Sequence, residues 1–247
     1  MTTVSFLAVT NLPEIRPGDD LVQLLATCNP PLQPGDILVV TQKVVSKAEG
    51  RLVALDSVEP GPRAKELALQ YDKHPGLVEL VLQESQELLR FEHGVLISRT
   101  REGFVCANAG IDLSNVDGGK TACLLPLNCD QSASKLRVGL TERLGFHLPV
   151  IISDSFGRPW RLGITNVALG CSGLNPMLDH RGQLDPNGLE MKATVMAVAD
   201  TLAAGTELVV GKTRGYGAAI VRGYDYQTDL DQGVQNTIRP WENCFFT

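Results

Sequence analysis

Short apolar runs alternate with longer amphipathic segments along this chain of 247 residues, and the alternation restricts it to folds that mix helices and strands. Runs rich in β-branched residues predict strands, and apolar residues that recur every three or four positions predict helices. The predicted strands lie at the N-terminus and at residues 36–42, 51–55, 149–153, 207–211 and 217–223, with a hairpin over 94–110 that turns at Glu102 and Gly103. The predicted helices lie at 62–70, 77–90, 131–144 and 189–205. The fold class is therefore mixed, α+β or α/β, and no repeat or change of composition marks a domain boundary.

Composition and charge exclude several classes of partner and location. No apolar run approaches the ~20 residues of a membrane-spanning helix, so we expect no membrane segment. The N-terminus lacks the basic region of a signal peptide, which favours the cytoplasm. A net charge of −6 argues against a nucleic-acid-binding surface, although small anionic ligands could bind at a local cluster of Lys and Arg or at a metal ion. The six cysteines are scattered without a CxxC pair, so we expect reduced thiols.

Four polar, glycine-rich stretches interrupt the apolar pattern and carry most of the reactive side chains. They cover residues 11–20, 41–50, 107–120 and 150–170. Loops that follow strands often carry binding and catalytic groups, because a rigid sheet positions them. The candidate functional residues therefore come from these four stretches.

Asp112 and Asp154 each follow an apolar run and have small residues nearby. With the hydroxyl of Ser155 and the amide of Asn115 they make an all-oxygen ligand set, which Mg²⁺ and Mn²⁺ prefer. The alternative is structural, because Asp112 could cap a turn after Gly110 and Asp154 could simply end a strand. Taken together, the two aspartates favour a metal site.

Basic side chains in the same stretches point to a phosphorylated ligand. Lys43, Lys47, Arg158 and Arg161 could neutralise phosphate oxygens beside a bound cation. The familiar signatures GxxxxGKS/T, GxGxxG after a strand, and HExxH are absent. The residues alone thus predict a metal-dependent enzyme that acts on a phosphorylated ligand.

The segment "SDSFGRPWR", residues 153–161, is interpreted as the end of a strand that builds this site. Its acidic and hydroxyl side chains would hold the cation, while Gly157 and Pro159 would shape a tight turn beside it. Arg158 and Arg161 would face anionic oxygens of a ligand. Alternatively, the two arginines form structural ion pairs with carboxylates elsewhere in the chain.

Longer segments give a more specific signal than any short pattern. They read "LPEIRPGDDL", "GDILVVTQKVVSKAEGR", "FVCANAGIDLSNV", "VIISDSFGRPWRLGITNVALG", and "ELVVGK" followed by "AAIVRG". In this order, from about residue 7 to residue 223, they closely resemble the coenzyme F420-0:L-glutamate ligase family. The closing "IRPWENCFF" resembles a divergent form of that family's ending.

The resemblance implies an enzyme of coenzyme F420 biosynthesis that joins the α-amine of L-glutamate to a carboxylate of coenzyme F420-0 and uses GTP. It also implies Mg²⁺ or Mn²⁺ as the divalent cation, with help from K⁺. A carboxylate is a poor electrophile, so the γ-phosphoryl group of GTP is first moved onto it. The amine then attacks the resulting acyl phosphate, and the protein mainly supplies positioning and charge neutralisation.

By the same resemblance, Asp112 and Asp154 are the metal-binding aspartates and Ser155 is a neighbouring metal ligand. We expect Asp112, Asp154 and Arg158 to take part in catalysis. The residues expected to contact the nucleotide are Leu12, Pro13, Glu14, Ile15, Gln42, Lys43, Lys47, Asn115, Gly211 and Lys212. Some relatives have Gln or Glu in place of Lys212, whose ammonium cannot ligate a metal, so the number of bound metals stays open.

The family fold implied by the resemblance is α+β and forms an intertwined homodimer. Residues 1–247 would make a single ligase unit with no additional C-terminal domain. Two other functions stay open on the residues themselves. One is a metal-dependent nucleotide hydrolase or phosphotransferase, and the other is a non-catalytic nucleotide-binding subunit, for which Lys212 is the only hint.

Overall fold

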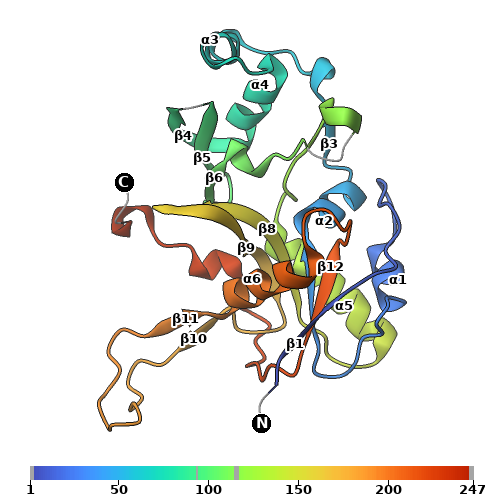
Figure 1. Ribbon diagram of the computed structural model, residues 1–247, viewed down its shortest axis with the longest axis vertical. Coiled ribbons are helices and arrows are strands. Elements are labelled where there is room, and N and C mark those ends of the chain that lie inside the picture. The colour runs from blue at the N-terminus through green and yellow to red at the C-terminus, as the bar shows by residue number, and fades with distance from the viewer. Residues whose placement is uncertain (1–2, 93, 114–116, 245–247) are drawn as a thin grey trace.

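A five-stranded sheet forms the centre of the computed structural model, which describes residues 3–92, 94–113 and 117–244 (Figure 1). The strand order is β1-β12-β2-β8-β9, and these strands cover Ser5–Ala8, Ala218–Arg222, Ile37–Thr41, Val150–Arg158 and Arg161–Ser172. Strands β2 and β8 pair in parallel, and the other neighbouring strands pair antiparallel. The fold is therefore mixed α+β, as predicted.

The α-helices are α1 (Leu21–Ala26), α2 (Gln42–Ala48), α3 (Pro62–Tyr71), α4 (Pro75–Glu84), α5 (Cys129–Leu144) and α6 (Val198–Val210). Helix α5 begins and ends at residues that suit helix termini. Before α5, the side chain of Asn128 accepts a hydrogen bond from the N–H of Gln131, which satisfies one free donor of the first turn. The same helix ends at Gly145, which adopts the left-handed conformation that glycine tolerates best.

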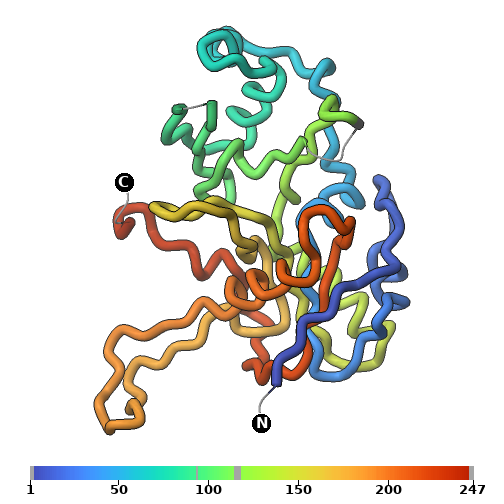
Figure 2. Tube along the Cα trace, in the orientation of Figure 1, coloured from blue at the N-terminus to red at the C-terminus, as the bar shows by residue number. Residues whose placement is uncertain are grey.

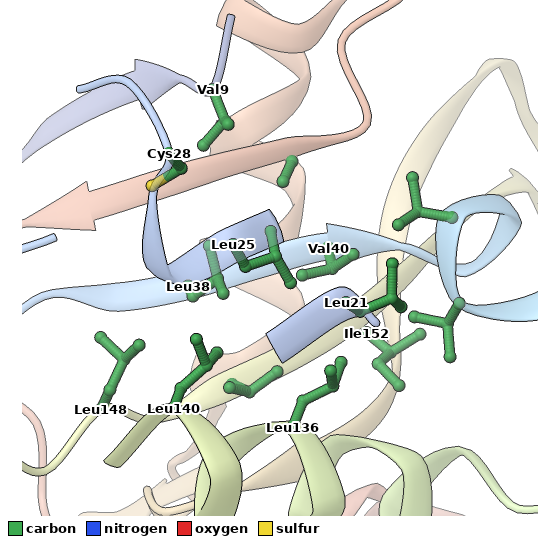
Figure 3. Close-up of a cluster of buried hydrophobic side chains, with 14 of the residues drawn as sticks. Val9, Leu21, Leu25, Cys28, Leu38, Val40, Leu136, Leu140, Leu148 and Ile152 are labelled. Atoms are coloured by element: carbon green, nitrogen blue, oxygen red, sulfur yellow. The ribbon is translucent and has the colours of Figure 1, made fainter. Parts of the chain in front are cut away.

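The central sheet is buried on both faces because successive residues of a strand point to opposite sides. Leu38 and Val40 of β2 pack against α1 and α5, as Figure 3 shows. Ile37 and Val39 of the same strand pack against α6 on the other face. Burial on both sides explains why β2, β8 and β12 read as continuous apolar runs in the sequence.

A second, smaller core lies above the central sheet in the view of Figure 1. It contains α3, α4 and the three-stranded sheet β4-β5-β6, whose strands cover Ser85–Glu92, Val95–Thr100 and Val105–Ala107. The strand pair β3 (Leu52–Ala54) and β7 (Thr121–Cys123) adds to it. We call this part the upper core.

Strands β10 (Met177–Asp179) and β11 (Val195–Ala197) form a narrow arm that extends from the body, in orange in Figure 2. The chain between them, residues 180–194, continues the arm beyond the strands. Leu184, Leu189 and Met196 expose 67%, 69% and 48% of their surface there. The arm therefore carries apolar side chains that the chain itself does not bury.

Several elements match the sequence-based predictions. The strands predicted at 36–42, 51–55 and 217–223 correspond to β2, β3 and β12, and the hairpin over 94–110 corresponds to β5 and β6. The helices predicted at 62–70 and 131–144 correspond to α3 and α5. The six cysteines carry free thiols. In the part of the chain that the structure describes, no helix is both long and apolar enough to cross a membrane.

The helix predicted over 77–90 is wrong in its second half. Helix α4 ends at Glu84, and the following residues form β4, which pairs with β5. Leu, Glu and Gln in this segment favour a helix locally. As part of a strand, however, Phe91 packs against the upper core and stacks on Tyr71, with ring centroids 3.7 Å apart. Tertiary pairing therefore outweighs local propensity here.

The helix predicted over 189–205 is wrong in its first half and is confirmed from Val198 onward, whereas the strand predicted over 207–211 is wrong. Residues before Val198 belong to the arm, and α6 includes most of the segment predicted as a strand. The two valines before Gly211 favour a strand locally. Yet Leu202, Thr206 and Val210 are buried at helical spacing, so the helix continues through them.

The strand predicted to end near Ser153 continues instead to Arg158. It then turns through Pro159 and Trp160 into β9, so the segment forms a hairpin. Trp160 has a φ of 56° directly after a proline, a pattern typical of a tight two-residue turn. Gly157 lies within the β8–β9 ladder and is not the turning residue that we predicted.

Candidate functional site

A cavity of about 730 Å³ collects side chains from all four polar stretches noted in the sequence. Its lining comes from the segments around residues 12–15, 41–47, 106–112, 153–166 and 207–217. The cavity thus lies where the end of the central sheet meets the upper core. Apolar, cationic and anionic groups all face it, as expected of a site that binds a charged organic ligand.

Helix α2 follows β2 directly and presents two lysines to the cavity. Lys43 and Lys47 are separated by about one helical turn and lie on one face. The Nζ atom of Lys43 lies 2.6 Å from Oδ2 of Asp112. Lys47 donates through Nζ to Oε1 of Glu14. The sequence predicts a loop here, and the observed helix instead fixes the spacing of the two ammonium groups.

Asp154 is a half-buried residue of β8 whose carboxyl group is harder to ionise than usual. Burial raises the pKa of Asp154 to about 6, and the Asp112 carboxylate adds to the increase, while Lys212 and Lys43 oppose it. The two aspartates therefore lie close enough to repel one another. A bound cation between them would relieve this repulsion.

Ser155 lies at the centre of a hydrogen-bonded chain. Its hydroxyl donates to Oδ1 of Asn166 over 2.6 Å, across the β8–β9 pair. Lys212 donates through Nζ to the same hydroxyl, and this ammonium lies 3.4 Å from Oε2 of Glu207. Glu207 belongs to the last turn of α6, and Lys212 follows Gly211 just beyond it. The end of α6 therefore places a positive charge at Ser155.

Two polar atoms in residues of the cavity wall have no hydrogen-bond partner among the described residues. They are Oγ of Ser153 and Oδ1 of Asn108. Buried polar atoms are rarely left unpaired, so we expect a ligand or solvent to satisfy them. Asn108, Ala109 and Gly110 also have positive φ angles of 51°, 52° and 71°. A positive φ is unfavourable for Asn108 and Ala109, though not for Gly110, and backbone strain of this kind clusters at functional sites.

The donor set of the cavity fits a hard divalent cation. Mg²⁺ in particular is usually held by one or two carboxylates, with phosphate oxygens and water completing its shell. Asp112 and Asp154 provide such a pair. Within residues 3–92, 94–113 and 117–244, no group of three or more His, Cys, Asp or Glu side chains gathers as a metal site. A cation here would therefore depend on ligand oxygens as well.

Most residues predicted for the site line this cavity. They are Leu12, Pro13, Glu14, Ile15, Gln42, Lys43, Lys47, Asp112, Asp154, Ser155, Gly211 and Lys212. The side-chain oxygen of Gln42 accepts a hydrogen bond from the Ser46 hydroxyl within α2, so Gln42 also stabilises that helix. Asn115 lies outside the described residues.

Arg158 and Arg161 are not among the residues that line the cavity. Both are exposed near the tip of the β8–β9 hairpin. Arg158 donates through Nη2 to the backbone oxygen of Leu162 over 2.6 Å. Among the described residues this arginine makes neither the predicted contact with the site nor an ion pair with a carboxylate. Its catalytic role stays a prediction that the position of the side chain does not support.

Asn166, Glu207 and Tyr216 line the cavity, but the sequence analysis did not name them as candidate site residues. Asn166 is a buried amide within an apolar strand, and a polar residue in such a run was a usable signal. The sequence pattern predicts a strand at Glu207, whereas this residue lies in the last turn of α6. Tyr216 stands between two glycines in the loop after that helix.

Known proteins resemble this chain over nearly all of its length. The sequence profile of the F420-0:gamma-glutamyl ligase family matches residues 10–223, a range that includes every segment of the cavity. A coenzyme F420:L-glutamate ligase of Methanothermobacter thermautotrophicus is 43% identical over 245 residues, which cover 97% of both chains. A protein of the same name from Methanopyrus kandleri is 43% identical over 89% of this chain and 87% of its own. Another, from Methanocaldococcus jannaschii, is 37% identical over 95% and 94% of the two chains.

Proposed function

This chain belongs to the F420-0:gamma-glutamyl ligase family, and from this premise we propose that it adds L-glutamate to coenzyme F420-0 in coenzyme F420 biosynthesis. The observation that carries the proposal is the cavity, where four carboxylates, two of them the neighbouring Asp112 and Asp154, and three lysine ammonium groups converge within the region that matches the family. Such a mixture of charges suits a ligand that combines anionic phosphates with a metal cation. Relatives named as ligases of coenzyme F420 and L-glutamate, 37–43% identical to this chain, support the same substrates.

We further propose that GTP activates the acceptor carboxylate. A carboxylate resists attack by an amine, because its negative charge and poor leaving group oppose the reaction. In the first step, the γ-phosphoryl group leaves GTP as the bond to GDP breaks, and it bonds to a carboxylate oxygen of F420-0. In the second step, the amine nitrogen of glutamate bonds to the acyl carbon, the bond from that carbon to the phosphate oxygen breaks, and inorganic phosphate and a proton are released.

The lysines of the cavity would perform the electrostatic part of this work. Lys43, Lys47 and Lys212 already lie within contact of oxygen atoms in the wall. In the complex they would bind phosphate oxygens of the nucleotide and neutralise the charge that moves during transfer. Phosphoryl transfer asks little else of a protein, since positioning and charge stabilisation supply most of the acceleration.

A divalent cation belongs to the same proposal. Asp112 and Asp154 would hold Mg²⁺ or Mn²⁺, which when bound would neutralise phosphate charge beside the lysines. The repulsion between the two carboxylates supports this assignment, because a cation would remove it. The part proposed for K⁺ rests on the family resemblance, so the assay buffer contains this ion.

We also propose that the protein acts as a homodimer. The support is the β10–β11 arm, on which Leu184, Leu189, Val195 and Met196 are exposed. Apolar side chains gathered on a projecting segment of this kind usually mark a protein–protein contact. The arm reaches away from the body, as an element that wraps a partner subunit would (Figure 1).

A single incubation tests the proposed activity. The protein is mixed with F420-0, GTP, Mn²⁺, K⁺ and L-glutamate, and the cofactor and nucleotide are then followed by mass spectrometry. We expect the mass of F420-0 to increase by one or more glutamate residues while GDP and phosphate appear. GDP without ligation would indicate a nucleotide hydrolase, and binding without either product would indicate a nucleotide-binding subunit. ATP in place of GTP serves as the nucleotide control.

A further inference from the structure

Lys212 is held at the wall of the cavity by three features of its surroundings. Its Nζ donates to Oγ of Ser155, and it lies 3.4 Å from the Glu207 carboxylate. It also follows the carboxyl end of α6, where the helix dipole favours a positive charge. The ammonium group therefore has a defined place in the wall of the site.

That place conflicts with the role of Ser155 as a metal ligand. The hydroxyl proton of Ser155 is directed to Asn166, and one of the two oxygen lone pairs accepts from Lys212. A divalent cation on the remaining lone pair would stand beside an ammonium group. Two positive charges at so short a separation repel one another strongly, even near a protein surface. A metal at Ser155 and the observed position of Lys212 are therefore incompatible.

We propose that the ammonium group of Lys212 takes the place of a second metal cation, so that the site binds one divalent cation, held by Asp112 and Asp154. This inference rests on the proposed function, because it concerns the cations that accompany the nucleotide in the same cavity. One tethered positive charge and one divalent ion then share the neutralisation of the nucleotide phosphates. Ser155 positions the lysine and does not bind metal.

The arrangement of donors around Lys212 supports a cation-binding position. The Ser155 hydroxyl and the Glu207 carboxylate together offer oxygen atoms to one point in the cavity. Oxygen donors of this kind bind a hard metal ion as readily as they bind an ammonium group. In this chain the ammonium comes from a residue two positions beyond the end of α6, so no free cation is required there.

Counting bound Mn²⁺ tests the inference without turnover. The protein is loaded with a GTP analogue that resists hydrolysis, with nucleotide kept below the protein concentration, and free Mn²⁺ is measured by electron paramagnetic resonance. The variants are Lys212→Gln, which removes the charge and offers an oxygen ligand, and Lys212→Met, which removes the charge alone. Ser155→Ala tests the hydroxyl, and Lys135→Gln on the exposed face of α5 is the matched control.

We expect one Mn²⁺ per bound nucleotide in the unmodified protein, in Lys135→Gln and in Ser155→Ala. Lys212→Gln should bind two Mn²⁺ ions per nucleotide. Its affinity for the second ion should be at least tenfold higher than the affinity of any weak second site in the unmodified protein. Lys212→Met should bind the nucleotide roughly tenfold to hundredfold more weakly, as expected on loss of one charge-assisted contact. Circular dichroism of each variant checks that it is folded.

Two results would overturn the inference. Either the unmodified protein binds two Mn²⁺ with Lys212 in place, or Lys212→Gln still binds only one. Ligation by the unmodified protein is measured in parallel, so that the two proposals are tested separately. Glutamate addition with two bound Mn²⁺ refutes only the present inference, whereas one bound Mn²⁺ without glutamate addition refutes only the proposed reaction. A protein that binds neither nucleotide nor Mn²⁺ refutes both.

Discussion

The lysines of the cavity each contact a neighbouring oxygen, so the charges of the site are partly balanced before any ligand is bound. Lys43 lies at Asp112, Lys47 at Glu14, and Lys212 at a hydroxyl of β8. The Lys47 side chain is only 10% exposed, whereas that of Glu14 is 75% exposed. A buried ammonium thus depends on a carboxylate that water solvates well. If phosphate oxygens of a ligand replaced the Glu14 carboxylate, they would bind a Lys47 ammonium group that is already in position.

Lys47→Met should weaken GTP binding far more than Lys73→Met, a substitution in the loop between α3 and α4 and outside the cavity lining. A hydrogen bond to a charged group contributes about 1.5–3 kcal/mol, so we expect the dissociation constant to rise roughly tenfold or more. Isothermal titration with GTP and Mn²⁺ measures both variants against the unmodified protein. Equal and negligible changes at the two positions would show that Lys47 does not bind the nucleotide.

Asp154→Asn should lower ligation by orders of magnitude and should not unfold the protein. The amide keeps the shape of the carboxylate but loses the charge that holds a divalent cation. Turnover at saturating Mn²⁺ and the circular dichroism spectrum are the two measurements. A folded variant that ligates glutamate at the normal rate would remove Asp154 from the metal site.

The same substitution should also change how stability depends on pH in metal-free protein. Because burial raises the pKa of Asp154 from 3.8 to about 6, the folded protein holds this proton more tightly than the unfolded chain does. Ionisation of Asp154 therefore lowers stability as the pH rises from about 4 to about 6, and the loss persists above that window. Asp154→Asn should then be more stable than the unmodified protein at pH 8, by roughly 1–3 kcal/mol, with no difference near pH 3. Urea unfolding with a chelator present, at each pH, decides this.

At the scale of helices and strands, the sequence predicts those elements whose type and ends depend on local signals, such as capping residues, and not on a distant pairing partner. Helix α5 has a capping Asn128 and a terminal Gly145, and its prediction is confirmed apart from two residues at its start. Strand β4 could not be predicted, since its Leu- and Glu-rich sequence favours a helix until β5 offers a partner.

The candidate site is likewise predictable only where local sequence signals mark its residues. Its charged residues stand out in polar, glycine-rich stretches, but Asn166 and Glu207 join it only through strand pairing and the true extent of α6.

Gly205 shows how a distant contact can override a local signal. It lies inside α6, although the sequence suggests that a helix ends there. A Cβ atom at this position would lie 2.3 Å from Cζ of the Phe6 ring in β1, so only glycine allows the helix to pack this closely on the sheet. The close approach in turn sets the end of α6, and with it Glu207 and Lys212, against the strands of the cavity.

Gly205→Ala should therefore destabilise the protein despite the better helix propensity of alanine. Overpacking costs about 1–3 kcal/mol, and the gain in propensity of up to about 1 kcal/mol offsets only part of it. Urea unfolding of the variant measures the difference. The double variant Gly205→Ala with Phe6→Leu should recover part of the loss, because the shorter side chain makes room for the methyl group. If Gly205→Ala is as stable as the unmodified protein, then α6 and β1 can move apart to accommodate the methyl group with no loss of stability.

On the scale of the whole molecule, the site lies between two cores that are built differently. The central sheet is buried between helices, and the upper core packs α3 and α4 on a separate sheet. The cavity takes lining residues from both, so a bound ligand would join them. The chain carries a net charge of −6, yet three lysines gather in the cavity. The overall field of the protein opposes an anionic ligand, so the proposed binding of GTP would depend on local contacts with these lysines and on the proposed cation.

The β10–β11 arm gives the last prediction, since its apolar residues have no cover within the described part of the chain. If the protein is a homodimer built through this arm, sedimentation equilibrium should give twice the mass of one chain. Leu189→Glu together with Met196→Glu should then shift the protein towards the monomer, because each change would bury a charge against an apolar partner surface. Leu69→Glu on α3, where the leucine is 87% exposed, is the matched control and should leave the mass unchanged. A monomeric parent protein, or a double variant that still sediments as a dimer, would exclude the arm as the interface.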